Sequence, residues 1–319
     1  MKKLFLTLAV IAMFINTKAQ KNVVLRINHF LGATPFAFNL KATNNLNNEF
    51  NATRLEYYIS NIIINHDSGQ HTTIPNLYVL VDAGSNTDID LGNFNITAIE
   101  GITFSIGVDS PNNNADPSLW PANHALSPKS PSMHWGWQSG YRFVAMEGVA
   151  GVGMISTYEI HALGNVNYFA TTVNKTATEF NGKWVIAIDA DYTKAIKDID
   201  VTQNLISHGE ADEAQKLLFN FRDNVFKPGT IVTGIKEANN NIDVSVWPNP
   251  SNGSFMVKVP SINAFNKIII TDITGKVILT KTDINSSSTQ TISIKNNGIY
   301  FMQVYNDDYM LGVKKLVVN

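Results

Sequence analysis

Short runs in which apolar and polar side chains alternate fill most of the chain between residues 20 and 191, and clusters of Gly, Pro, Asn and Asp separate them. A period of two places successive side chains on opposite faces of a strand. Many short runs of this kind with turn residues between them are typical of a β-sandwich or barrel. The runs expected to form strands, mostly antiparallel, cover residues 23–29, 55–64, 77–82, 102–109, 141–147, 158–162 and 184–190.

A helical period replaces the alternation at residues 211–226, where apolar residues recur every three or four positions and Pro228 and Gly229 follow as a stop signal. We expect this helix to pack against the sandwich. Residues 233–243 have few large apolar side chains and contain three consecutive asparagines, so we interpret them as a linker. The predicted fold is therefore mostly β: an antiparallel β-sandwich with one helix near its C-terminal end, over residues 20–232, then a small C-terminal β-sandwich domain at 244–319.

The N-terminal 19 residues differ from the rest. Lys2 and Lys3 precede an apolar stretch over residues 4–15, and Thr17 to Ala19 resemble a cleavage site. The apolar stretch is too short to span a bilayer. Residues 1–19 are therefore predicted to be a signal peptide, and the mature protein is expected to be exported without a stable transmembrane segment.

The composition narrows the possible functions. A chain of 319 residues is long enough for two cores. Only 16% of the residues are charged and the net charge is −2, which argues against a nucleic-acid partner and against an anionic membrane surface. The chain has no cysteine, so disulfides, thiolate metal sites and cysteine nucleophiles are excluded. A metal would need His, Asp, Glu or a more unusual ligand.

Enzyme signatures are missing from the sequence. Neither Gly-x-Ser-x-Gly, a phosphate-binding glycine loop nor His-Glu-x-x-His occurs, so we expect the protein not to be an enzyme. Residues 109–116 are rich in Asp and Asn and have the oxygen ligands that calcium prefers, but such runs are also the commonest loop sequence. We interpret this segment as a loop in preference to a calcium site.

The C-terminal segment resembles the C-terminal sorting domain, type A, of proteins exported by the type IX secretion system of Bacteroidetes. Four motifs carry the resemblance in order: WPNP at 247–250 with NG at 252–253, IIITDITGKV at 268–277, GIYF at 298–301 and KKLVV at 314–318. Thr274-Gly275 is expected to close a hairpin. The resemblance implies contact with the type IX outer-membrane machinery, passage across the outer membrane, and release or attachment at the cell surface.

Residues 20–232 resemble the MbnP-like copper-binding family. The resemblance lies in TPF at 34–36, RLEYYISNI at 54–62, VDA at 81–83, IGVDS at 106–110, MHWGWQSGYRF at 133–143, EG at 147–148, IHALG at 160–164 and SHG at 207–209. It implies a copper site of imidazoles and a tryptophan that a partner diheme enzyme oxidises to kynurenine. Trp135 or Trp137 would be that tryptophan. The chemistry is consistent, because an unmodified indole has only an N–H donor, whereas kynurenine offers a nitrogen ligand.

Three histidines are candidate metal ligands. His29 shares a parity with the apolar residues of its strand, so it should point into the sandwich, either as a ligand or as a hydrogen-bonded core residue. His161 matches a family motif and falls on the face of Thr157 and Glu159. His134 precedes Trp135, so in a regular strand the two side chains would point to opposite faces.

The other histidines have simpler interpretations. His66, His71 and His124 lie in polar stretches and are expected to be exposed, and His208 is expected to cap or pack against the following helix. A stripe of aromatic residues of one parity is more often sandwich core than redox site, and the family resemblance makes the two readings comparable. The stripe comprises Trp135, Trp137, Tyr141 and Phe143.

We therefore expect a secreted or cell-surface copper-binding protein that captures or stores copper. The alternatives are a structural or adhesive surface protein that keeps the fold without metal, and a secreted hydrolase without a recognisable motif.

Overall fold

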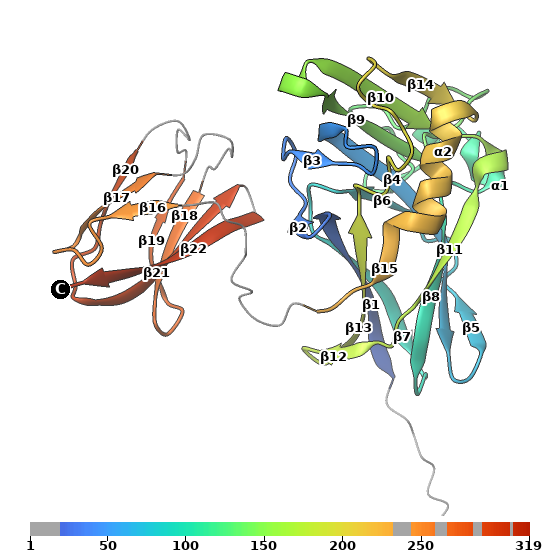
Figure 1. Cartoon of the computed structure of the whole chain (residues 1–319). Coiled ribbons are helices and arrows are strands. Elements are labelled where there is room, and N and C mark those ends of the chain that lie inside the picture. The colour runs from blue at the N-terminus through green and yellow to red at the C-terminus, as the bar shows by residue number, and fades with distance from the viewer. Residues whose placement is uncertain (1–19, 232–243, 259–266, 283–288, 307–308) are drawn as a thin grey trace, which may run out of the picture.

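The computed structural model describes residues 20–231, 244–258, 267–282, 289–306 and 309–319, and the chain is mostly β (Figure 1). The predicted signal peptide at 1–19 and the predicted linker at 233–243 lie outside the described residues. The described helices include none with the length and apolarity needed to cross a membrane.

One face of the N-terminal sandwich is a six-stranded sheet. Its central strands β1 and β13 are parallel and in register from Val23 opposite Trp184 to Phe30 opposite Asp191. Leu25 and Ile27 of β1 lie beside the equally buried Ile186 and Ile188 of β13. The strands are β12 (Thr178–Phe180), β13 (Lys183–Asp191), β1 (Lys21–Leu31) and β2 (Thr34–Pro35), with β15 (Phe226–Pro228) on β13 and β7 (Thr87–Phe94) on β1.

The other face is a nine-stranded sheet built around the 18-residue strand β4 (Glu49–His66). Its main path is β11 (Phe169–Asn174), β8 (Ile99–Ile106), β4, β9 (Val144–Ala150), β10 (Ser156–Ala162) and β14 (Ile206–Gly209); β3 (Ala42–Thr43), β5 (Gln70–Thr73) and β6 (Val79–Asp82) also pair with β4. The pairing of β10 with β9 is antiparallel, and that with β14 is parallel. Thus β10 holds β14 at the end of the sheet.

The core between the sheets is rich in aromatic side chains. Tyr57, Tyr192 and Phe221 are fully buried and contact one another with ring centroids 5.0 to 6.3 Å apart. Buried aromatic pairs in tilted and edge-to-face arrangements add to the stabilisation that burial gives. This packing joins β4 of one sheet to residues that follow β13 of the other.

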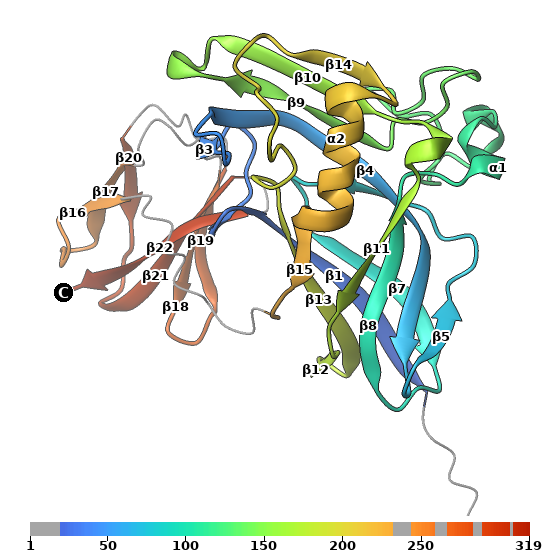
Figure 2. The same ribbon diagram turned by 45° about the vertical axis from the view of Figure 1, so that its right-hand side comes forward.

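The predicted helix is present. Helix α2 (Asp212–Asn220) continues through a π-helical turn at Phe221–Val225 and buries the apolar residues whose spacing predicted it. Figures 1 and 2 show α2 along one side of the sandwich, and it contacts β10 and β14. The Ala214 N–H near its start donates a hydrogen bond of 3.0 Å to Ser207 Oγ. The helix thereby fastens β14 to the domain.

The C-terminal domain forms two small sheets around a core of its own. The first contains β16 (Ser245–Trp247), β17 (Ser254–Lys258) and β20 (Gln290–Ser293); the second contains β19 (Val277–Lys281), β18 (Lys267–Asp272), β21 (Gly298–Asn306) and β22 (Tyr309–Val318). Gly275 has φ +85° in the hairpin between β18 and β19, a conformation that glycine adopts readily. The predicted Thr274-Gly275 hairpin is therefore present.

The segment between β8 and β9 differs from the expectation. Alternation predicts strands over 102–109 and 141–147, but β8 ends at Ile106 and β9 begins at Val144. The intervening residues contain only two short helical turns, α1 (Ser110–Asn113) and Pro117–Leu119, and an isolated bridge between His134 and Tyr141. Local alternation did not reveal that residues 107–143 form a long connection.

Candidate metal centre

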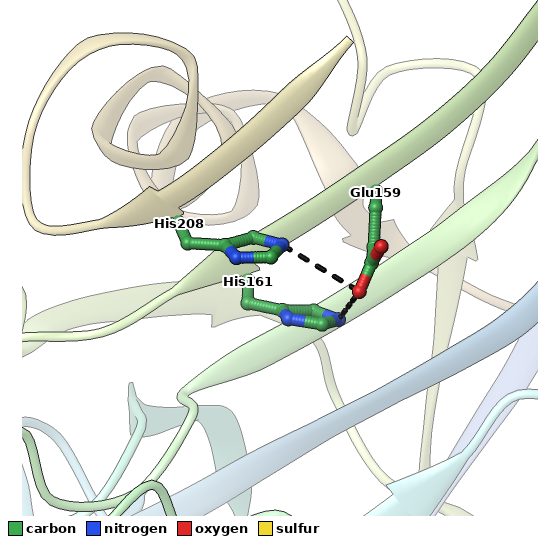
Figure 3. A group of neighbouring side chains, drawn as sticks. All are labelled: Glu159, His161 and His208. Atoms are coloured by element: carbon green, nitrogen blue, oxygen red, sulfur yellow. Dashed lines mark ion pairs between the residues drawn. The ribbon is translucent and has the colours of Figure 1, made fainter. Parts of the chain in front are cut away.

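Two histidines lie side by side where β10 meets β14. The parallel register places His161 of β10 opposite His208 of β14. Their rings stack with centroids 4.4 Å apart and an interplanar angle of 12° (Figure 3). His161 is buried, with its side chain 3% exposed, whereas that of His208 is 25% exposed. The pair therefore has one buried and one accessible imidazole.

Two carboxylates face the imidazoles. Glu159, two residues before His161 on the same face of β10, places Oε1 3.5 Å from Nε2 of both His161 and His208. Glu147 of β9 places Oε1 2.8 Å from His161 Nε2. Glu159, His161 and His208 each offer a ligand atom, and these atoms lie within 4.8 Å of one another. Such a set of imidazole and carboxylate donors can hold a transition metal.

Arg54 of β4 forms an ion pair with Glu147. Its Nη1 lies 2.8 Å from Glu147 Oε1, and its Nε donates to Glu56 Oε2 at 2.6 Å. The Arg54 side chain is only 12% exposed, so it is held between two acids in a partly desolvated position. Charge-assisted hydrogen bonds of this kind are stronger than neutral ones and fix geometry. Glu147 is thus oriented from both sides, by Arg54 and by His161.

Burial and hydrogen bonding determine the charges of the group. Burial lowers the pKa of His161, and the hydrogen bond to Glu147 only partly opposes this effect. For Glu147, burial acts to raise the pKa, but hydrogen bonds from His161 and Arg54 outweigh it and leave a lowered pKa. At neutral pH the site therefore contains a neutral imidazole beside an ionised carboxylate. These are the protonation states in which the two groups bind metals.

Trp135 borders the histidine pair. Its ring lies edge-to-face against His208 at 4.9 Å and against His161 at 5.8 Å, measured between ring centroids. The Arg142 guanidinium lies over the Trp135 ring, 4.9 Å from its centroid. Trp135 is 40% exposed, whereas Trp137 is 75% exposed. Of the two tryptophans in the family motif, Trp135 is the one in contact with the imidazoles.

The aromatic stripe is only half core. Tyr141 and Phe143 are buried as expected, but Trp135 and Trp137 are exposed. Gly136 has φ +90°, and the chain turns there, with the Trp135 N–H bonded to the Gly140 carbonyl. The turn breaks the strand parity from which a continuous stripe was expected.

The structure places His29 in the other sheet, away from this group. Its Nδ1 lies 2.6 Å from the Tyr192 hydroxyl and its Nε2 lies 2.9 Å from Thr87 Oγ1, so both ring nitrogens are hydrogen-bonded. Burial lowers the pKa of His29 to about 4. The inward-facing position of His29 allowed two roles, metal ligand or hydrogen-bonded core residue. This arrangement matches the hydrogen-bonded core residue.

His134 also remains outside the group. Its Nδ1 accepts a hydrogen bond of 3.3 Å from the Gly136 N–H, and its ring lies edge-to-face on Tyr141 at 4.7 Å. Burial lowers its pKa, and the charge of Asp116 partly opposes this effect. His134 therefore packs beneath the turn that presents Trp135.

Among the remaining histidines, His71 is exposed as expected, but His66 is buried and hydrogen-bonded to Thr72 Oγ1 at 2.8 Å. His124 is half-buried and stacks on Trp120 with centroids 4.1 Å apart. Polar neighbours in the sequence suggested exposure, and tertiary packing overrode it.

His208, Glu147 and Glu159 were missed as site residues. His208 does not cap the helix, because it lies in β14 and Ser207 makes the hydrogen bond to α2. Two signals were available: the motifs SHG and EG in the family resemblance, and the shared parity of Glu159 with His161. The segment 109–116, interpreted as a loop, contains a short helical turn at Ser110–Asn113, and Asp109 accepts a hydrogen bond from the Tyr78 hydroxyl.

Comparison with known proteins finds a separate match for each of the two domains. Residues 20–214 match the family described as MbnP, and residues 245–319 match the family described as the secretion system C-terminal sorting domain. Among solved structures, MbnP from Methylosinus trichosporium is similar at 15% identity over 60% of this chain and 81% of that chain, with a TM-score of 0.42. A second structure, titled as the BSP domain of a biofilm associated protein, is similar at 9% identity over 96% of this chain and 52% of that chain, with a TM-score of 0.21. No curated protein matches the chain.

Proposed function

The chain belongs to the MbnP family and ends in a secretion system C-terminal sorting domain, and from this premise we propose that it captures or stores copper outside the cell. The sorting domain directs the chain through type IX secretion to the cell surface or the medium. The proposed role is binding and not catalysis. Copper is its cargo, and the stacked imidazoles of His161 and His208 are the ligands on which the proposal depends.

The donor chemistry is compatible with copper. Imidazole suits Cu, Zn, Fe and Ni, and among divalent first-row ions Cu²⁺ binds a given nitrogen and oxygen site most strongly. Glu159 and Glu147 add negative charge beside the imidazoles. One ring nitrogen, His161 Nδ1, is buried and has no hydrogen-bond partner among the described residues. A bound ion would satisfy such a nitrogen.

Trp135 is the proposed site of tryptophan modification. It contacts both imidazoles, whereas Trp137 is largely exposed. By resemblance to the family, a partner diheme enzyme would oxidise it to kynurenine, whose nitrogen would add a ligand that indole lacks. The 40% exposure of Trp135 leaves it accessible to such a partner.

Copper content and intact mass of the chain test the proposal together. The wild-type chain is expected to retain one copper per molecule, and His161→Ala and His208→Ala are expected to lose it. His71→Ala is the matched control, because His71 is exposed and bonded only to Asn65 at 2.9 Å among the partners described. Protein from the native host should also have the mass change of one tryptophan converted to kynurenine. Equal copper in all four proteins, or none in any, contradicts the proposal.

A further inference from the structure

The two ring nitrogens of His161 have opposite surroundings. Nε2 lies 2.8 Å from Glu147 Oε1 and 3.5 Å from Glu159 Oε1. An ionised carboxylate only accepts hydrogen bonds, so the nitrogen facing it must carry the proton. The neutral imidazole of His161 is therefore the tautomer with hydrogen on Nε2, and its lone pair is on Nδ1.

Nδ1 is the nitrogen without a partner. It is buried, and no described residue donates a hydrogen bond to it. A buried acceptor in this condition is unfavourable unless something else binds it. In Figure 3 the second nitrogens of the two stacked rings lie on the same side, away from Glu159. The second nitrogen of His208 therefore lies on the same side of the stacked pair as the free lone pair of His161.

The carboxylate that faces Nε2 of His161 is itself held in place by further charged residues. Glu147 accepts from His161 and is held by Arg54, which also bonds Glu56. In metal centres, a ligating histidine commonly donates its other N–H to a carboxylate, and this outer contact fixes the tautomer and the ring orientation. Arg54, Glu147 and His161 have that arrangement.

We propose that copper binds His161 through Nδ1, and that Glu147, held by Arg54, is a positioning residue that accepts the Nε2 proton. This inference rests on the proposed copper site and specifies which atom binds, and it places copper on the side of the His161 ring away from Glu159. Binding through Nε2 would break the bond to Glu147 and would move the ring proton to Nδ1. No described residue offers that proton an acceptor, so binding through Nε2 would lose one charge-assisted hydrogen bond and leave a buried N–H without a partner.

Nitrogen NMR of the full-length chain labelled at histidine tests the ring assignment, with Cu(I) as the probe because its closed shell leaves the spectra unbroadened. His161→Gln assigns the signals. We expect Nε2 of His161 to remain protonated before and after loading, while the Nδ1 signal shifts. Loss of the Nε2 proton on loading overturns the inference and leaves the proposed function intact. Absence of Cu(I) uptake contradicts the proposed function itself.

Variants of Glu147 test its positioning role. Glu147→Ala should lower Cu(I) affinity about 10- to 100-fold, the usual effect of losing an outer carboxylate, and should produce a mixture of His161 tautomers. Glu147→Gln keeps an oxygen that accepts the Nε2 proton, so it should restore the single tautomer and part of the affinity. Glu179→Gln, on an exposed carboxylate that pairs with Lys21, is the control. Wild-type affinity and an unchanged tautomer in Glu147→Ala would overturn the inference.

Discussion

Replacement of His161 by phenylalanine distinguishes a ligand from a structural residue. The His161 side chain is 3% exposed and donates to Glu147 at 2.8 Å. A hydrogen bond to a charged group contributes about 1.5–3 kcal/mol, whereas the unpartnered Nδ1 costs about 1–3 kcal/mol. Phenylalanine removes both contributions and keeps an aromatic ring beside His208. The two contributions largely cancel, so the free energy of unfolding of the metal-free chain should change by no more than about 2 kcal/mol.

Urea unfolding of the full chain, followed by aromatic circular dichroism, measures this change. Ile160→Ala is the control on the same strand, because Ile160 is fully buried and its truncation should cost about 2–5 kcal/mol. At free copper a hundred times the Kd, the wild type should gain about 2.7 kcal/mol and the His161→Phe variant nothing. A loss in His161→Phe as large as that in Ile160→Ala would refute the reasoning, since it would make His161 a core residue.

Three further predictions concern other parts of the molecule. Burial lowers the pKa of His29 to about 4 from 6.5, so the unfolded chain binds this proton more readily; stability should fall by about 3 kcal/mol as the pH drops from about 6.5 to about 4, and His29→Gln should show a smaller fall in urea unfolding. Trp135→Phe should remove most of the fluorescence quenching that Cu²⁺ causes, and Trp137→Phe little of it, because Trp135 contacts His161 and His208 whereas Trp137 is largely exposed. Deletion of residues 244–319 should retain the protein inside the outer membrane, as immunoblots of cell fractions and medium would show.

The local pattern of the sequence was sufficient for the fold class but not for strand pairing. Alternation located the strands that became β1 and β10, and a helical period located α2. The parallel pair of β1 with β13 joins segments far apart in the chain, and side-chain packing between them sets its register. Periodicity describes one segment at a time, so it contains no information on such a partner.

The candidate site was also predictable within single strands but not across strand pairs. Parity placed His161 on the face of Glu159, and the two side chains do lie together. His208 joins them only because β14 pairs with β10 in parallel, a tertiary fact that its own neighbours in sequence do not reveal. Trp135 was assigned a strand parity that the turn at Gly136 removes. The residues missed are therefore those positioned by strand pairing and by turns. Alternation along β10 did identify the strand face on which Glu159 and His161 lie.

Anomalous diffraction at the copper absorption edge from crystals of the copper-loaded chain tests the central claim most directly. One anomalous peak within bonding distance of the imidazoles of His161 and His208, next to Trp135, is the predicted result. A peak at another place, such as beside His29, or no peak after loading, would contradict the assignment of this histidine pair as the copper site.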